Sequence, residues 1–236
     1  MILKKIRKTL TLFAVFALAA AAASCSNALK FKNDGDTGNL IDAENGRYYI
    51  YCKGYLQAAA IKPALYAKGD RGEKLYEVDG LDPALWLSED ISGGIPFLFR
   101  EKGVEEPLFE EFETEKIVIT MTGEISVAIG QIIDRETVDM IVSDYIGGKK
   151  RPYPEIVTDH FTFLFESEKY RGIYYVLEYL VDEKNNAFLY NRWTDPYSCV
   201  PCGYKMFGGT GIDWGLLDDL DDLDDLDDLD DWEDLE

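Results

Sequence analysis

Histidine and basic side chains are scarce in this chain of 236 residues. It contains one histidine, four cysteines, and 24 Lys and Arg against 45 Asp and Glu, so its formal net charge is −21. Nucleic-acid binding depends on Lys and Arg side chains that neutralise phosphates, and this acidity argues against such a partner. The sequence also lacks a Gly-rich phosphate loop, an EF-hand loop and a Gly-x-Ser-x-Gly nucleophile elbow. The common motifs of nucleotide-binding proteins, calcium sensors and α/β-hydrolases are therefore missing.

A run of apolar residues long enough for a transmembrane helix is missing as well. The apolar stretch Leu10–Ala23 is shorter than the roughly 20 residues that a helix needs to cross a bilayer. Four cations precede it, at Lys4, Lys5, Arg7 and Lys8. A basic start, a short apolar core and small residues at its end are typical of a secretory signal. Residues 1–24 are therefore predicted to be a signal peptide that is removed on export.

The end of this leader, Ala22-Ala23-Ser24-Cys25, resembles the lipobox of bacterial lipoproteins. Ala22 stands where Leu is commoner in that family. The resemblance implies that Cys25 is diacylated and becomes the new N-terminus, and two or more acyl chains give stable anchoring. It places the chain on the cell surface or the periplasmic side of a bacterial membrane. The alternative is an ordinary signal with Ala-x-Ala cleavage.

Composition divides the remainder into three parts. Residues 25–46 are polar and indicate a flexible spacer behind the lipidated cysteine. Residues 47–207 are rich in aromatic and β-branched side chains and predict one globular domain. Residues 208–236 are a Gly-containing linker followed by an acidic tail. Between Cys25 and Leu216 there are 20 basic and 32 acidic residues, so the body itself is acidic.

The pattern of the body predicts an α+β fold, mainly of antiparallel strands. One clear amphipathic helix is expected over about 134–147, because its apolar residues recur at helical spacing between Asp134, a suitable N-cap, and Gly147-Gly148. Asp82-Pro83 indicates a short helix. Hairpins are expected on either side of 121–123 and 183–186. In the strand Ile173–Val181, the predicted buried residues alternate: Ile173, Tyr175, Leu177, Tyr179 and Val181.

Cys199-Val200-Pro201-Cys202 is the motif with the most chemical promise. A Cys-x-x-Cys pair can exchange electrons when one thiolate has a lowered pKa. Here, however, no helix follows the motif as it does in thioredoxin-like proteins. A zinc site would need about four ligands, and only Cys52 and His160 remain to complete one. We favour a structural disulfide or inert thiols among Cys52, Cys199 and Cys202 over redox or metal chemistry.

His160 follows Asp159, which could orient it for acid–base catalysis. No serine or cysteine is paired with it by any motif, so a solvated histidine at a strand end is the favoured interpretation. We therefore assign no catalytic, cofactor-binding or metal-binding residue, and no cofactor. The chain is not expected to be an enzyme.

The tail repeats the unit Leu-Asp-Asp from Leu217 to Asp231. A three-residue repeat drifts by about 60° per unit around an α-helix, so its leucines form no apolar stripe. Disorder is therefore expected. A tolerated tandem expansion is favoured over cation capture or binding to a basic partner.

Together these features predict a membrane-anchored extracytoplasmic lipoprotein, a non-catalytic binding or accessory module of the cell envelope. The abundant Tyr and Phe suggest a stacking surface for an envelope glycan or peptide, and a protein partner is a further possibility. Two alternatives remain open: a thiol-disulfide oxidoreductase that uses Cys199 and Cys202, and a cation or basic-partner binder that uses the tail.

Overall fold

The computed structural model describes residues 28–35, 37–89, 96–122 and 126–206. The predicted signal peptide, Cys25 and the acidic tail lie outside these residues. The chain divides into two compact units. Unit 1 comprises residues up to Cys52, 58–90 and 96–105, and unit 2 comprises residues 53–57, 91–95 and those from Glu106 onward.

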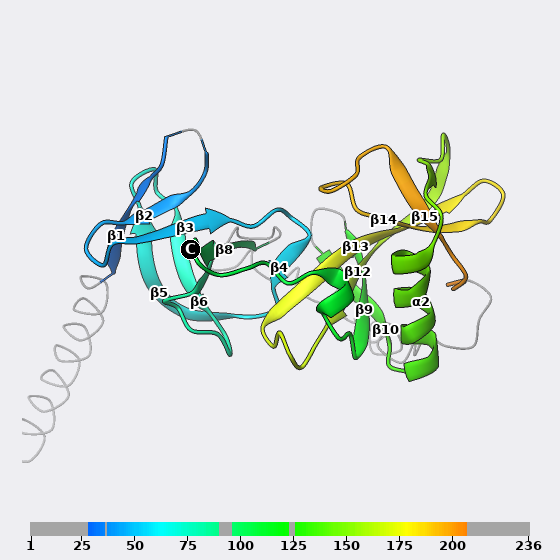
Figure 1. Ribbon diagram of the computed structural model, residues 1–236, viewed down its shortest axis with the longest axis horizontal. Helices are drawn as coiled ribbons and strands as arrows, with labels where there is room; N and C mark the ends of the chain where they lie inside the picture. The colour runs from blue at the N-terminus through cyan, green and yellow to red at the C-terminus, as the bar shows by residue number, and fades with distance from the viewer. Residues whose placement is uncertain (1–27, 36, 90–95, 123–125, 207–236) are drawn as a thin grey trace, which may run out of the picture. The chain divides into compact units, whose positions relative to one another are not determined.

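Unit 1 is a seven-stranded barrel (Figure 1). Its strands are β1 (Leu29–Asn33), β2 (Leu40–Asp42), β3 (Arg47–Tyr51), β5 (Ile61–Gly69), β6 (Lys74–Val78), β7 (Trp86–Glu89) and β8 (Phe97–Glu101). They follow the order β8-β3-β2-β1-β5-β6-β7, and pairing of β7 with β8 closes the ring. Neighbours are antiparallel except for β1 and β5. Closure leaves this sheet without a free edge.

Each of the seven strands sends one buried side chain into the centre of the barrel. These residues, in the order of the sequence, are Phe31, Leu40, Tyr49, Ala67, Leu75, Leu87 and Phe99. The rings of Phe31 and Tyr49 stack with centroids 5.4 Å apart. The Tyr49 hydroxyl donates a hydrogen bond to the backbone oxygen of Pro83 at 3.1 Å. The barrel interior is therefore filled by side chains, as expected for a barrel of this small size.

Unit 2 is an antiparallel sheet with one helix. Its elements are β4 (Leu56–Ala58, whose last residue belongs to unit 1), the 3-10 turn η1 (Phe109–Glu111), β9 (Lys116–Thr122), β10 (Ser126–Ile132), α2 (Arg135–Gly147), β11 (Arg151–Pro152), β12 (Val157–Glu166), β13 (Ile173–Asp182), β14 (Ala187–Tyr190) and β15 (Ser198–Cys202). Strands β10, β9, β12 and β13 are neighbours in that order, and β14, β15 and β11 continue the sheet beyond β13. The two predicted hairpins are confirmed as β9–β10 and β13–β14.

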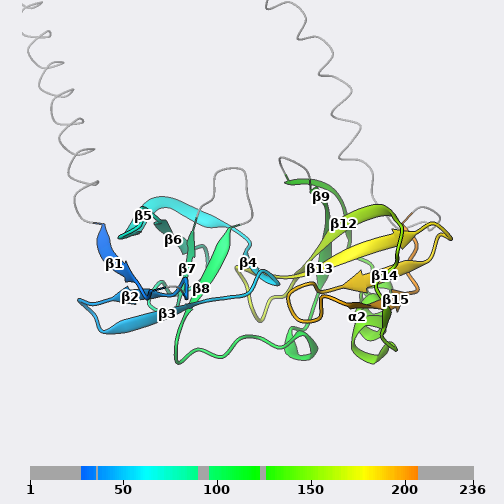
Figure 2. The same cartoon turned by 90° about the horizontal axis from the view of Figure 1, so that it is seen from above.

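Helix α2 lies along one face of this sheet, against β9 and β15 (Figure 2). Asp134 caps it by accepting a hydrogen bond from the backbone N–H of Thr137 at 2.9 Å. Val138 and Ile141 are fully buried against the sheet. The predicted helix and its cap are thus confirmed. Among the described residues, no helix combines the length and apolarity needed to span a membrane.

All five predicted buried residues of β13 are confirmed as buried: Ile173, Tyr175, Leu177, Tyr179 and Val181. Opposite them, β12 buries Phe161, Phe163 and Phe165, which pair with Tyr179, Leu177 and Tyr175. The apolar character of every second residue from Ile173 to Val181 explains this success. Val176 and Leu180 on the opposite face are buried as well, which a prediction of one buried face does not include.

The expected α+β class is wrong, because the described chain is mainly β and contains a single α-helix. The short helix expected at Asp82-Pro83 is one turn, in which the Asp82 side chain accepts from Ala84 N at 2.8 Å, before the chain enters β7. The stretch interrupted by Pro63 belongs to β5, where the pairing register with β6 shifts between Ile61 and Leu65. Proline is tolerated at such an irregularity because no ladder hydrogen bond is lost there.

The expected division of the chain also needs correction. The spacer predicted over 25–46 contains β1 and β2, which are barrel strands. The single domain predicted over 47–207 is divided between the two units. Polar loops such as the one joining β1 to β2 concealed two short strands, of which β1 buries Phe31 and β2 buries Leu40 and Asp42.

The two glycines at the end of α2 should respond in opposite ways to replacement by alanine. A Cβ on Gly148 would lie 2.2 Å from Val200 Cγ1 and 2.3 Å from the backbone oxygen of Asp144, whereas a Cβ on Gly147 meets nothing within 4 Å. We expect Gly148→Ala to lower the free energy of unfolding by about 1–3 kcal/mol through overpacking. Gly147→Ala should raise it by up to about 1 kcal/mol through helix propensity. Urea denaturation checks both, and equal stability of the two variants would contradict the close approach of α2 to β15.

Candidate functional site

The two cysteines of the predicted redox motif lie three residues apart in an extended strand, β15. Side chains at odd spacing in a strand point to opposite faces. Cys199 packs with Leu180 and Tyr190 on the face away from α2, and Cys202 is buried on the other side. Both are free thiols, and burial raises the pKa of Cys199 to about 11 and that of Cys202 to about 12. This arrangement favours the inert-thiol alternative, because thiol exchange requires an accessible thiolate.

Cys52 is fully buried and belongs to unit 1, whereas Cys199 and Cys202 belong to unit 2. Cys25, the predicted lipidation site, lies outside the described residues. Among the described residues, no group of three or more His, Cys, Asp and Glu side chains could hold a metal ion.

His160 is not oriented by Asp159. Its Nε2 lies 3.1 Å from the Glu178 carboxylate, which also accepts a hydrogen bond from Nε of Arg192 at 2.5 Å. Burial opposes ionisation of Glu178, but the hydrogen bonds from His160 and Arg192 outweigh it and lower the pKa of this carboxyl. With the side chain of His160 about half exposed, the group is a surface ion-pair network on one face of the sheet. It contains no nucleophile.

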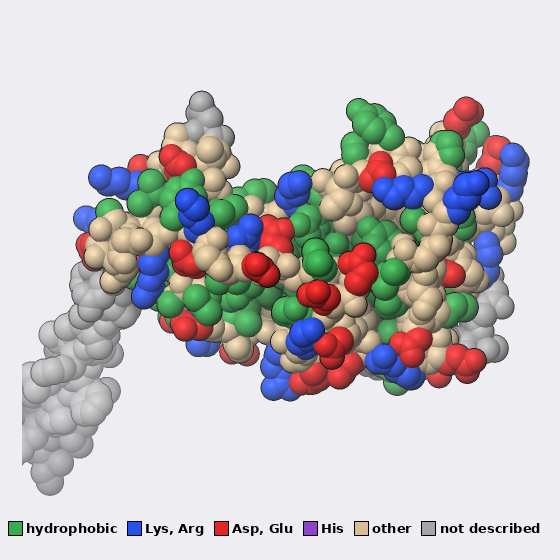
Figure 3. Space-filling model, viewed as in Figure 1, with side chains coloured by type: hydrophobic (Ala, Val, Ile, Leu, Met, Phe, Trp, Pro, Cys, Tyr) green, Lys and Arg blue, Asp and Glu red, His purple; other side chains and the backbone are tan. Residues whose placement is uncertain are grey.

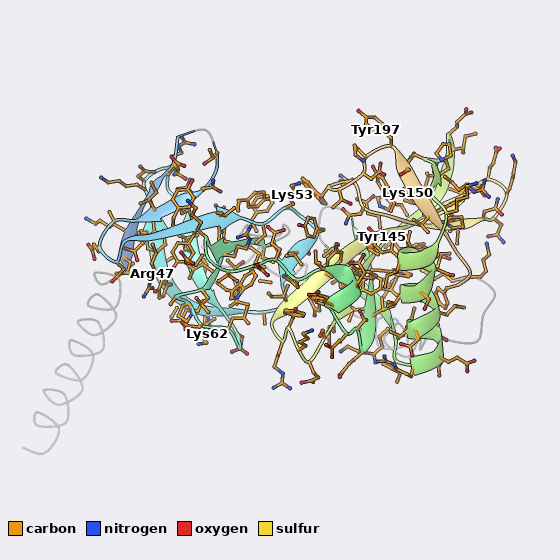
Figure 4. The ribbon with its side chains drawn as sticks, viewed as in Figure 1. Arg47, Lys53, Lys62, Tyr145, Lys150 and Tyr197 are labelled. Carbon is orange, nitrogen blue, oxygen red and sulfur yellow. The ribbon has the colours of Figure 1, made fainter. Side chains whose placement is uncertain are left out.

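The best-formed polar pocket lies in unit 2, with a volume of about 220 Å³. The C-terminal end of α2, η1, the strands β14 and β15 and the loop between these strands supply its walls (Figure 4). Its lining residues are Glu110, Tyr145, Ile146, Lys150, Leu189, Asn191, Thr194, Asp195, Ser198 and Val200. The lining combines polar and charged groups with the apolar side chains of Ile146, Leu189 and Val200.

Asn191 holds the loop of residues 191–197 in one conformation. Its Oδ1 accepts hydrogen bonds from the backbone N–H groups of Trp193 at 3.1 Å and Thr194 at 3.2 Å. Its backbone oxygen accepts from the N–H of Asp195 at 3.0 Å. At the far end of the loop, the Tyr190 hydroxyl donates to the backbone oxygen of Pro196 at 3.2 Å. The loop is therefore organised before any ligand arrives, which lowers the entropic cost of binding.

The same side chain carries an unsatisfied donor. Asn191 is only 5% exposed, and its Nδ2 makes no hydrogen bond of normal geometry within the described chain, although the Tyr145 phenol lies close enough to interact with the amide. The two backbone N–H groups fix Oδ1, so the amide cannot be flipped to satisfy Nδ2. A buried unsatisfied donor costs about 1–3 kcal/mol.

Tyr145 stands next to Asn191 in the pocket wall. Burial raises the pKa of its phenol, while hydrogen bonding to the Asn191 and Thr194 side chains acts in the opposite direction. Tyr145 is therefore a neutral phenol at physiological pH. Its hydroxyl can both donate and accept a hydrogen bond.

Asp195 joins the two remaining polar groups of the wall. Its Oδ2 accepts hydrogen bonds from Nζ of Lys150 at 2.7 Å and from Oγ of Ser198 at 2.5 Å. These bonds, the one from Lys150 first, lower the pKa of Asp195 to about 2. A carboxyl this acidic is a poor general base near neutral pH, since efficient bases have pKa values near the working pH. Ser198 is thus not activated as a nucleophile.

Two large aromatic side chains are exposed on the loop beside the pocket. Trp193 is 46% exposed and Tyr197 is 83% exposed. Tyr197 projects away from the body of unit 2 (Figure 4). The Trp193 indole lies on Gly54, where a Cβ would come within 2.4 Å of the ring. The absence of a side chain at Gly54 therefore leaves the space that the indole occupies.

A second hollow, of about 490 Å³, is lined by Arg151, Phe188 and Lys205, among others. The described part of the chain has two buried side-chain atoms without a partner, Asn191 Nδ2 and Tyr204 Oη, and neither residue lines this hollow. The smaller pocket is therefore the better candidate for a binding site.

Comparison with models of protein families, with curated proteins and with solved structures found no match to this chain. Function therefore rests on the geometry of the site. None of the pocket residues was singled out from the sequence. The signal available was Asn191-Arg192-Trp193-Thr194-Asp195-Pro196, in which turn-forming residues place a tryptophan in a loop after a buried strand.

The depressed pKa of Asp195 predicts a pH dependence of stability. Its charged form is favoured in the folded state, so this stabilisation is fully present above the unfolded pKa of 3.8 and is lost as pH falls through about 2. We expect wild type to lose more stability than Asp195→Asn between about pH 4 and pH 2. Urea denaturation of both proteins across that interval measures the difference, in which the other carboxylates cancel. Parallel curves would contradict the Lys150–Asp195–Ser198 network.

Proposed function

We propose that this chain is a lipid-anchored extracytoplasmic protein whose unit 2 is a non-catalytic module that binds a saccharide. The observation that supports this function is the pocket in which the Asn191 amide, the Tyr145 phenol and the Ser198 hydroxyl meet beside exposed Trp193. Amide, hydroxyl and carboxylate groups complement the hydroxyls of a sugar, and an aromatic face packs on the apolar face of its ring. The ligand belongs to the class of envelope glycans expected from the sequence.

Two features favour binding over catalysis. The pocket contains no nucleophile paired with a base, because the acidic Asp195 accepts the hydrogen bond of Ser198. The thiols of Cys199 and Cys202 are buried with raised pKa values and do not line the pocket together with its polar groups. A thiol-disulfide oxidoreductase is accordingly not proposed.

The proposed location is based on the leader sequence, residues 1–24. A basic start, a short apolar core and Ala22-Ala23-Ser24-Cys25 support export and acylation of Cys25, as they do in bacterial lipoproteins. Lipid at this residue would hold unit 1, which begins a few residues later, near the membrane. The second acyl chain matters, because a single chain gives only marginal binding.

Saccharide binding should depend on the tryptophan. In isothermal titration calorimetry of the full chain against a panel of oligosaccharides, we expect at least one ligand to bind. Trp193→Ala should weaken that ligand at least about tenfold, the effect of a truncation that costs about 1.4 kcal/mol. Gly54→Ala should weaken it too, because the added Cβ displaces the indole.

Leu108→Ala is the matched control, since Leu108 is 58% exposed on unit 2 and does not line the pocket. The affinity of Leu108→Ala for the saccharide should equal that of wild type. The proposal fails if no oligosaccharide of the panel binds, or if Trp193→Ala and Leu108→Ala bind equally well.

Acylation of Cys25 is tested separately, by metabolic labelling with an alkyne palmitate in a bacterial host. We expect label on the wild-type chain, a membrane-bound product and no label on Cys25→Ala. Cys52→Ala serves as the control and should keep its label. Label that persists in Cys25→Ala would overturn the anchor.

A further inference from the structure

We infer that the second hollow of unit 2, of about 490 Å³, is a docking surface for the Leu-Asp-Asp repeat of this same chain, residues 217–231. The inference is independent of saccharide binding. It gives the acidic tail a basic partner on the chain's own surface. Three observations support it: the lining of the hollow, the position of Lys205 in the chain, and the period of the repeat.

The accessible part of the lining is apolar. Pro152 of β11 and Pro201 of β15 are exposed, and Phe188 of β14, which pairs with Pro201, is partly buried. Proline rings lose no rotamer freedom when they are covered, so an aliphatic side chain that packs here gains burial at little entropic cost to the protein. The hollow is therefore suited to a leucine side chain.

Two cations stand beside this apolar lining, Arg151 and Lys205. The Arg151 guanidinium has no carboxylate partner within the described residues. Nζ of Lys205 donates to the backbone oxygen of Asn185 at 2.6 Å, and among the described side chains no carboxylate neutralises it. Both charges are therefore available to carboxylates from outside the two compact units.

The carboxylate in the same lining, Asp182, is turned toward its own loop. Its Oδ1 accepts hydrogen bonds from the backbone N–H groups of Lys184 at 2.9 Å and Asn186 at 2.8 Å. In Figure 3, Lys and Arg side chains gather at the upper right, over the end of unit 2 where Figure 1 shows β11 and the turn after β13. This end is thus locally basic on a body that is acidic overall, and it complements an acidic segment.

The tail begins next to the hollow. Lys205 lines it, and Leu217, the first leucine of the repeat, follows after a short Gly-containing segment. Residues 207–216 can span roughly 16–19 Å, the r.m.s. length of a Gly-rich chain of this size. The repeat can therefore return to the hollow. A tether of this kind gives an effective concentration in the millimolar range, so even a weak contact is populated.

The period of the repeat fits an extended bound conformation. A polyproline II helix has three residues per turn, so a three-residue repeat places all its leucines along one edge and its aspartates along the other two. One leucine can then enter the hollow while the flanking aspartates reach Arg151 and Lys205. Because the units from Leu217 to Asp231 are alike, neighbouring registers are equivalent, and binding does not depend on any single unit.

Paramagnetic relaxation in NMR tests the contact in the full chain carrying Cys25→Ala. A nitroxide is attached through Glu233→Cys, which leaves the repeat intact. The thiols of Cys52, Cys199 and Cys202 are buried, so the new cysteine is the reactive one. We expect the nitroxide to weaken the amide signals of residues 186–188. Signals of β10, at the other end of the sheet, should keep their intensity.

Arg151→Glu combined with Lys205→Glu should abolish this loss of signal, because the aspartates are then repelled. The matched control combines Lys30→Glu with Lys74→Glu on unit 1, where both side chains are exposed. It changes the net charge equally and should retain the loss. A measurement without any change to the hollow is also decisive: raising the ionic strength from about 0.05 M to about 0.5 M should restore the signals through screening.

The inference is overturned if residues 186–188 keep their full signal, or if the loss survives both Arg151→Glu with Lys205→Glu and high salt. A mixture of nitroxide-labelled chains with isotope-labelled chains that lack the nitroxide identifies the occupant. Signal loss in that mixture equal to the loss within one chain would assign the hollow to the tail of a second copy, and would also overturn the inference. None of these outcomes affects the proposed saccharide binding.

Discussion

The side chain of Tyr179, in the middle of β13, is the interaction on which unit 2 depends. Its ring stacks on Phe163 of β12 with centroids 4.7 Å apart. Its hydroxyl donates to the backbone oxygen of Tyr204 and accepts from the N–H of Met206, which holds the chain that leaves β15. Burial raises the pKa of this phenol to about 12, so it remains a neutral donor. One residue thus joins the aromatic core to the last described segment.

The register of β13 then positions the site. Tyr179 pairs with Leu189 of β14, and Leu189 pairs with Val200 of β15. The pocket-lining residues Leu189 and Val200 therefore belong to one row of cross-strand neighbours that starts at the core tyrosine. The loop that begins at Asn191 spans the same two strands. Because a shift by one residue would turn this whole row to the other face, the core that fixes the register also fixes the pocket.

Sequence patterns predicted those elements whose stability is local or strictly periodic. The helix after Asp134 was found because capping and apolar spacing act within one segment, and one buried face of β13 because every second residue on it is apolar. The barrel was missed because each short strand adds a single side chain, such as Phe31 or Leu40, to the central apolar cluster, and because closure depends on pairings remote in sequence, including the parallel pair of β1 and β5. No local pattern contains that information.

The pocket could not be predicted for a related reason: what marks it is the hydrogen-bond partner that the Asn191 amide nitrogen lacks. Asn191 resembles any turn-forming asparagine in the sequence, and its Oδ1 does serve that purpose. Only the arrangement of α2 beside β14 and β15 leaves Nδ2 enclosed without an acceptor. A leucine at this position would bury no donor but would release the two backbone N–H groups of the loop. The poorly satisfied amide nitrogen is therefore a cost of organising the loop.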